Sequence, residues 1–192
     1  DDIQGDYVFR TISGLPTLVA YIGNDAEIIL PDNYNGGNYA IGANVFKKNN
    51  TITSIVIGSS VTSIGYSAFK GCLGLTSIEI GNSVTEIGSD AFSGCTGITS
   101  VTIGNSVTNI SSTAFDGCSS LKKAIWLTNT PPSGYKNVDA TYNYVANNQY
   151  SGLSNLKEYP YLSSMFEVDG VKYVPVSPAE RTCDAIDCSY ND

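Results

Sequence analysis

Cysteine is the residue type in this chain whose spacing first suggests chemistry. Three of the five cysteines, Cys72, Cys95 and Cys118, recur at a constant interval along the chain. If each interval forms one coil and the coils stack on one another, the α-carbons of these cysteines would lie about 5 Å apart, which is within disulfide range. Three equivalent thiols cannot all pair with one another, so we predict a buried ladder of small, weakly polar side chains that contact loop backbone. Asn49 precedes Cys72 by the same interval and so holds the equivalent position in an earlier copy of the repeat. Asparagine satisfies backbone groups in the same way.

The other two cysteines, Cys183 and Cys188, lie outside this spacing. A local disulfide between them would suit an exported protein, and the sequence leaves their redox state open. Metal binding is disfavoured, because two thiols without a histidine leave the coordination shell incomplete. The Asp and Asn cluster at 32–38 lacks the closing bidentate Glu of a calcium loop. We expect no metal and no cofactor.

Patterns typical of enzymes are missing from the sequence. There is no histidine for a Ser-His-Asp triad and no serine-containing nucleophile elbow. Two carboxylates could in principle hydrolyse a glycoside, but no Asp or Glu pair stands in a distinctive motif. We therefore predict a protein without catalytic activity.

The cysteine interval belongs to a longer repeat. Four phenylalanines keep the same 23-residue step, at Phe46, Phe69, Phe92 and Phe115. Apolar residues alternate in Ile78-Glu-Ile80 and Val101-Thr-Ile103, which indicates a strand with one buried face. Glycine then permits a turn, and a second extended piece follows, such as 84–87. The Ala-Phe pair comes after a Gly-Ser or Ser-Ser opening that suits a single helical or 3₁₀ turn.

One such coil cannot bury its own phenylalanine and isoleucines, so neighbouring coils must cover them. Strands of successive coils should pair in parallel at about 4.8 Å. The predicted fold class is mainly β with short helical or 3₁₀ turns. Its architecture is a right-handed solenoid of parallel β-sheet coils with a 23-residue repeat and irregular caps.

The repeat resembles a known family. The phrase Ala-Phe-x-Gly-Cys-x-x-Leu-x-x-Ile-x-Ile-Gly-Asn-Ser-Val-Thr-x-Ile-Gly is similar to the BspA-like leucine-rich repeat of bacterial surface proteins, over residues 41–126. Gly58, Gly81 and Gly104 stand where that family commonly has proline. The resemblance implies a secreted or outer-surface protein that adheres to host or microbial macromolecules. It supplies no catalytic residues to carry over.

Three regions are predicted along the chain. Residues 1–40 form an N-terminal cap with a hairpin and an irregular first coil, in which Ile28 and Leu30 match Ile55 and Ile57. Residues 41–127 hold the repeats. Residues 128–192 form a C-terminal cap or begin a further repeat block. We expect a strand at 142–145, a short helix or helical turn at 154–165 and a β-hairpin at 166–174, with a type I′ turn at Asp169-Gly170.

Charge and hydropathy narrow the range of partners. Ten basic residues stand against 18 acidic ones, for a net charge of −8. We therefore do not expect nucleic acid or an anionic membrane as a partner, because phosphate binding needs clustered Lys and Arg. The sequence contains no run of 18 apolar residues, the length that a membrane-spanning helix needs. The chain opens without a basic and apolar signal region. Given the family resemblance, we expect an exported protein, extracellular or on the outer surface, whose signal segment is absent from this chain.

The candidate binding residues are the outward positions of the strands and exposed tyrosines. We predict a contact surface made by Ser77, Glu79, Ser100, Thr102, Lys123, Ile125, Tyr142 and Tyr144. The expected partner is a protein or a glycan on a host or neighbouring cell, bound by a monomer. A carbohydrate-binding module that uses the C-terminal tyrosines is the alternative, because tyrosine offers a large contact area with little entropy loss. A structural spacer in a longer surface chain is a further alternative.

Overall fold

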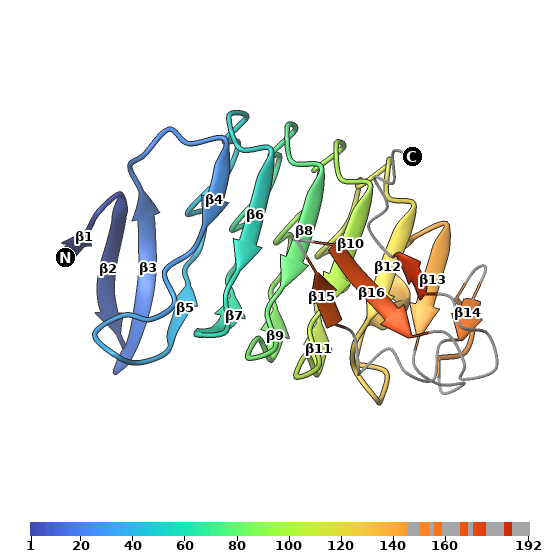
Figure 1. The fold of residues 1–192 in the computed structure, drawn as a ribbon. Helices are drawn as coiled ribbons and strands as arrows, with labels where there is room; N and C mark the ends of the chain where they lie inside the picture. The colour runs from blue at the N-terminus through green and yellow to red at the C-terminus, as the bar shows by residue number, and fades with distance from the viewer. Residues whose placement is uncertain (146–149, 154–155, 159–165, 169–170, 176–182, 186–192) are drawn as a thin grey trace.

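The structure is a computed structural model. It describes residues 1–145 and 150–153, together with the backbone of four strands at 156–158, 166–168, 171–175 and 183–185. The chain winds into coils stacked along one axis (Figure 1), with two sheets of seven strands on opposite sides of the stack. The predicted β-solenoid is confirmed.

One of the two sheets, here called sheet B, is parallel throughout and takes one strand from each coil. Its order is β14-β13-β12-β10-β8-β6-β4. From Ser54 to Lys123 the paired residues advance by the same interval each time, as Ser54, Ser77, Ser100 and Lys123 show. The strands are β4 (Glu27–Ile29), β6 (Ser54–Ile57), β8 (Ser77–Ile80), β10 (Ser100–Ile103), β12 (Lys123–Trp126), β13 (Tyr142–Val145) and β14 (Leu156–Glu158).

The other sheet, here called sheet A, begins with the N-terminal hairpin and continues with the second strand of each coil. β2 and β3 pair antiparallel around Ser13 and Gly14, whose positive φ values of 51° and 83° give the tight turn its twist. Its strands are β1 (Asp2–Gln4), β2 (Tyr7–Ile12), β3 (Leu15–Tyr21), β5 (Tyr39–Ile41), β7 (Val61–Ile64), β9 (Glu86–Ile87) and β11 (Asn109–Ile110). The predicted hairpin is confirmed, and so is the alignment of Ile28 with Ile55.

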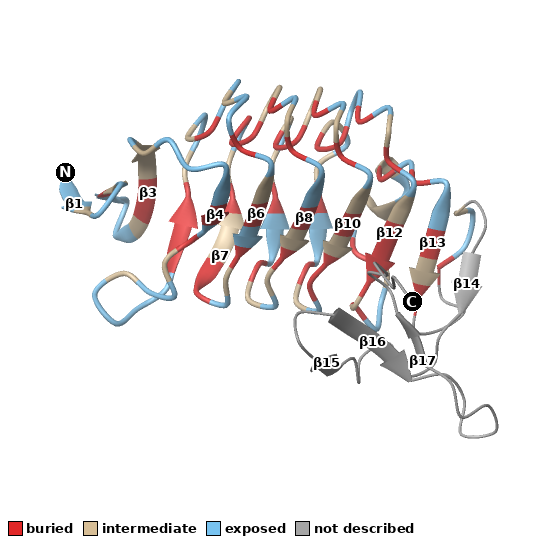
Figure 2. Ribbon diagram, turned by 45° about the horizontal axis from the view of Figure 1, so that its top comes forward, coloured by how far each residue is buried: buried red, intermediate tan, exposed pale blue. Residues whose placement is uncertain are grey.

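The core is a column of aromatic rings between the two sheets. Neighbouring phenylalanine rings lie 4.9, 5.1 and 5.1 Å apart from Phe46 to Phe115 and are stacked within 21° of parallel. Tyr21 continues the column at 5.5 Å from Phe46. All four phenylalanines are buried and belong to one core cluster with the inward strand residues. Figure 2 shows buried positions recurring from coil to coil along the stack. Each ring thus covers the next one, as the repeat predicts.

The segment around the Ala-Phe pair is a series of turns, and the helical or 3₁₀ turn expected there is wrong. Ala68, Lys70 and Cys72 each donate an N–H to the carbonyl three residues earlier, at 3.1–3.3 Å. Ser67 and Gly71 have φ values of 53° and 72°, and such left-handed residues interrupt a right-handed helix. The one 3₁₀ helix among the described residues is Tyr135–Asn137.

The same segments form a third set of bonds between coils, here called the turn ladder and made by residues 44–48, 67–71, 90–94 and 113–117. Ser67, Phe69 and Gly71 donate their N–H groups to carbonyls of the next coil at 2.8–2.9 Å. Phe92 and Gly94 do the same towards Ala114 and Asp116, at 2.8 and 2.7 Å. N–H groups in the turns bond alternately within the coil and to the next coil. The turns therefore help the strands to hold neighbouring coils in register.

The parallel sheet continues past residue 127. β13 and β14 extend sheet B, and the strand at 142–145 is confirmed. Leu156–Glu158 is a strand, so a helix is wrong for those residues. β15 (Phe166–Val168) and β16 (Val171–Pro175) pair antiparallel, which confirms the strands of the hairpin, and β17 (Cys183–Ala185) adds a third strand. The turn at 169–170 lies outside the described residues. The division of the chain at 40 and 127 stays a prediction.

Replacing one ring of the column should weaken the whole stack. We expect Phe92→Ala to lower the free energy of unfolding by about 3–5 kcal/mol, because a buried ring is lost and its two neighbours face a cavity. A urea titration followed by circular dichroism measures this. The control Tyr66→Ala removes a half-exposed ring and should change stability by less than about 0.5 kcal/mol. Equal losses in the two variants would argue against the column as the main source of stability.

Close approach between coils requires glycine after some of the sheet B strands and not after others. A Cβ at Gly104 would lie 2.6 Å from the Ile80 carbonyl oxygen and closer still to that of Gly81. At Gly58, the same position in the first repeat, the nearest atom would be 3.7 Å away. We therefore expect Gly104→Ala to destabilise by about 1–3 kcal/mol through overpacking and Gly58→Ala to cost less than about 0.5 kcal/mol. Thermal unfolding of the matched pair checks this, and a Gly58→Ala loss as large as that of Gly104→Ala would contradict it.

Candidate interaction surface

The strands of sheet B present two rows of side chains away from the core, which together are called the outward face. The first row follows the register from Ser54 through Ser77 and Ser100 to Lys123 and Tyr142. The second row begins at Ile29 and continues through Val56, Glu79, Thr102, Ile125 and Tyr144. The register therefore places all eight predicted residues, from Ser77 to Tyr144, on one face.

Exposure differs along this face. Ile29 is 72 % exposed and Val56 41 % exposed, and they are paired neighbours at the N-terminal end. Ser77 is exposed, whereas Glu79, Ser100, Thr102, Lys123 and Tyr144 are half-buried. Tyr142 is 45 % exposed at the other end. Ile29 was missed in the sequence analysis, although the alignment of Ile28 with Ile55 implies its place beside Val56.

Ile125 does not offer the exposed surface expected of it. Its register partner Thr102 is half-buried, but Ile125 itself is only 4 % exposed. Alternation along a strand determines which face a side chain occupies and says nothing about what else covers that face. Beneath the same strand, Trp126 donates its indole N–H to the Asn143 side-chain oxygen at 3.0 Å, which satisfies a buried amide that the apolar pattern did not anticipate.

The threonine rows are bound to the backbone. The hydroxyls of Thr62, Thr85 and Thr108 each donate to a carbonyl of the preceding coil at 3.1–3.2 Å. Thr76 and Thr99 do the same beside sheet B. These hydroxyls therefore add bonds between neighbouring coils.

The three repeat cysteines form the predicted ladder. Each thiol donates to the carbonyl oxygen of the phenylalanine in the preceding coil, at 3.0–3.2 Å. All three are free and buried. Burial raises the pKa of Cys118 to about 12. Hydrogen bonding with the Cys95 side chain, together with burial, also raises the pKa of Cys72. The Asn49 side-chain oxygen accepts the N–H groups of Thr51 and Ile52. Both residue types therefore contact loop backbone as predicted, but the thiols act as donors and the asparagine as an acceptor.

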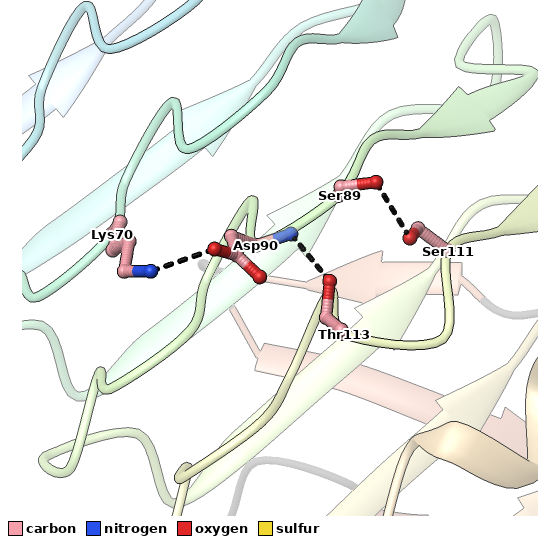
Figure 3. A network of polar contacts seen from close by, with 5 residues as sticks. All are labelled: Lys70, Ser89, Asp90, Ser111 and Thr113. Atoms are coloured by element: carbon pink, nitrogen blue, oxygen red, sulfur yellow. Dashed lines mark hydrogen bonds and ion pairs between the residues drawn. The ribbon is translucent and has the colours of Figure 1, made fainter.

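Polar side chains connect the turns on the surface (Figure 3). Lys70 Nζ lies 2.6 Å from Asp90 Oδ2, and hydrogen bonding to Lys70 lowers the pKa of Asp90. The Asp90 N–H donates to Thr113 Oγ1 at 3.0 Å, where other coils use a carbonyl. Ser89 and Ser111 hydroxyls lie 3.0 Å apart. This network ties together three successive turns and has no reactive geometry.

Two further sequence hypotheses concern the C-terminal part. Tyr150 is buried and bonds to the carbonyl of Thr128, so it supports the core. The Cys183–Cys188 disulfide lies outside the described residues. Within the described residues no group of three His, Cys, Asp or Glu side chains is placed to hold a metal ion. In that same part of the chain, no helix has the length and apolar character needed to cross a membrane.

Parallel strands in a regular coil repeat, with a phenylalanine column and a carbonyl-bound cysteine ladder, define a leucine-rich repeat solenoid. The family model described as BspA type leucine rich repeat region matches residues 39–159 in six copies. The chain belongs to this family. Leucine-rich repeat families are in general non-enzymatic modules for protein interaction or surface attachment.

Solved structures of other leucine-rich repeat proteins are similar. One from Bacteroides capillosus is 26 % identical, with a TM-score of 0.57, and the match covers 65 % of this chain and 96 % of that one. One from T. pallidum is 20 % identical, with a TM-score of 0.48 and coverage of 76 % and 84 %. One from Bacteroides ovatus is 23 % identical, with a TM-score of 0.45 and coverage of 65 % and 47 %. A comparison with curated proteins finds no significant match.

The buried thiols should resist alkylation. Only the thiolate is nucleophilic, and the raised pKa of Cys118, about 12, keeps that thiol protonated at pH 8. Hydrogen bonding with Cys72 lowers the pKa of Cys95, so for that thiol the protection comes from burial alone. We expect iodoacetamide to leave Cys72, Cys95 and Cys118 unmodified in the folded protein, because all three are buried away from the reagent, and to modify all three in urea, as peptide mass spectrometry would measure. Labelling of Cys118 at the same rate in both conditions would refute the buried ladder.

Proposed function

We propose that this protein is a non-catalytic leucine-rich repeat module of a secreted or cell-surface protein, which binds a host or microbial macromolecule through the outward face of sheet B. The observation that carries the proposal is the exposed apolar pair on the outward face. Ile29 and Val56 lie side by side on paired strands, 72 % and 41 % exposed. The pair Ser54–Ser77 continues the same face on the next strands.

The character of the outward face supports a macromolecular partner. Ile29 and Val56 place apolar surface at one end, and Tyr142 places an exposed aromatic ring at the other. Between them lie small serine and threonine side chains together with Glu79 and Lys123. A face of this kind suits a broad docking surface, in which a few aromatic or apolar residues supply most of the binding energy. The net charge of −8 favours partners that are not anionic.

The proposed location is extracellular or on the outer cell surface, and the proposed state is a monomer. The location is supported by the resemblance to bacterial surface repeats. A carbohydrate-binding function through Tyr142 and Tyr144 is the second candidate. The specific observation in its favour is the 45 % exposure of Tyr142, because an exposed tyrosine ring can stack on a sugar.

Affinity capture from host extracellular extract, with the folded chain as bait, tests the proposal. We expect Ser77→Arg to lower the recovery of captured protein at least about tenfold, because a long charged side chain in the middle of the face opposes close contact. The matched control Ser59→Arg changes an exposed serine in the loop between the sheets and should capture as the unmodified chain does.

The outcomes separate the candidates. Capture that is insensitive to Ser77→Arg would place recognition elsewhere on the molecule. Selective binding on a glycan array that is lost in Tyr142→Ala and Tyr144→Ala would favour the carbohydrate function. Turnover of a substrate by the purified chain would overturn the non-catalytic proposal.

A further inference from the structure

The last fully described coil is shorter than the others. Sheet B partners keep one constant interval from Ser54 to Lys123, but the next partner, Tyr142, follows Lys123 four positions earlier than that interval requires. The shortening falls after Ser133, because that residue still pairs with Asn109, one position beyond the regular interval. A single 3₁₀ turn at Tyr135–Asn137 replaces the long turn of the earlier coils.

Because of this shortening, the last turn of the turn ladder, 113–117, has no equivalent turn in the next coil to accept its N–H groups. In the preceding coil, the N–H groups of Phe92 and Gly94 donate to Ala114 and Asp116. Their equivalents are the N–H groups of Phe115 and Gly117. Within the part of the chain that the structure describes, neither has a hydrogen-bond acceptor. By the regularity of the ladder, both point along the solenoid axis, away from Phe92.

A hollow of about 290 Å³ lies at these two donors. Turn residues 115–119 and Leu121 line one side of it, and Asn137 and Asp139 of the short coil line the other. Asp116 and Asp139 are exposed carboxylates at its edge. The hollow therefore combines two backbone donors that no described residue satisfies with acceptors for positive charge.

We propose that this hollow binds an extended peptide segment carrying basic side chains, which adds to the turn ladder through its own backbone. Two alternate carbonyls of the peptide accept the N–H groups of Phe115 and Gly117, in the way that the Ala114 and Asp116 carbonyls accept those of Phe92 and Gly94 at 2.8 and 2.7 Å. A Lys or Arg side chain of the peptide lies at Asp116 and Asp139. Recognition of this kind is strand addition at an open edge.

The spacing of the donors selects the class of ligand. Phe115 and Gly117 are two residues apart, and their equivalents in three coils are matched by carbonyls two residues apart. A peptide backbone repeats its carbonyls at this interval, whereas sugar hydroxyls have no such period. The carboxylates favour a basic peptide over an acidic one. This site is separate from the outward face of sheet B, so it does not depend on the function proposed there.

Amide hydrogen exchange on the full chain tests the proposal. In the free protein, we expect Phe115 and Gly117 to exchange faster than Phe92 and Gly94, because the latter pair is hydrogen-bonded. The probe is the synthetic peptide acetyl-Lys-Val-Lys-Val-Lys-amide. At a concentration about ten times its Kd, exchange at Phe115 and Gly117 should slow about tenfold, while Phe92 and Gly94 stay unchanged.

A charge reversal gives the matched comparison. The double variant Asp116→Lys and Asp139→Lys should lose protection by the lysine peptide and gain it from acetyl-Glu-Val-Glu-Val-Glu-amide. The control pair Asp32→Lys and Glu86→Lys makes the same change in net charge at exposed positions elsewhere and should behave as the unmodified chain. Heteronuclear NMR spectra of both variants report whether each is folded.

Three results would overturn the proposal. Exchange at Phe115 and Gly117 as slow as at Phe92 and Gly94 in the free protein would mean that the donors are already satisfied. Protection by galactose in place of the peptide would assign the hollow to a sugar. No change in protection with either peptide would remove the site.

Discussion

A single coil of this chain is too thin to have an interior, and every other property of the structure follows from that constraint. The phenylalanine of one coil is covered by the phenylalanines on either side of it, at about 5 Å. The backbone must therefore keep the same rise on every side of the solenoid. It does so through the two sheets and through the turn ladder, whose bonds of 2.7–3.0 Å connect the Ala-Phe segments of neighbouring coils. Register is the property that these contacts jointly enforce.

The residues that first suggested chemistry serve this register. The thiol of Cys95 and the hydroxyls of Thr85 and Thr99 all donate to carbonyls of the preceding coil. These carbonyls also accept a backbone N–H, so each recurring side chain adds a second bond to the same oxygen. The proposed recognition therefore rests on side chains that project from the solenoid, such as the exposed Ile29 and Val56 on the outward face, and on the end of the turn ladder.

Periodicity allowed much of the fold to be predicted. The alternation in Ile78-Glu-Ile80 located the strand and its buried face, and the match of Ile28 with Ile55 located the first coil. The turn conformation was missed, because Ser67 and Asp90 occupy left-handed conformations that their residue types do not announce. The burial of Ile125 was missed for a different reason: a strand pattern describes one sheet and not its covering. The hollow beside Phe115 follows from a shortened coil, which the degraded repeat after Trp126 did not make visible.

The direction of the bonds between coils also determines how the molecule would respond to tension. The hydrogen bonds of the sheets and of the turn ladder run along the long axis, from one coil to the next. A force applied between the two ends is therefore carried by every junction in series, and the coils separate one after another, beginning at the weakest junction. Each released coil adds about 80 Å of extended chain, at roughly 3.5 Å per residue. A solenoid built in this way would lengthen in steps under tension while its remaining coils stayed folded.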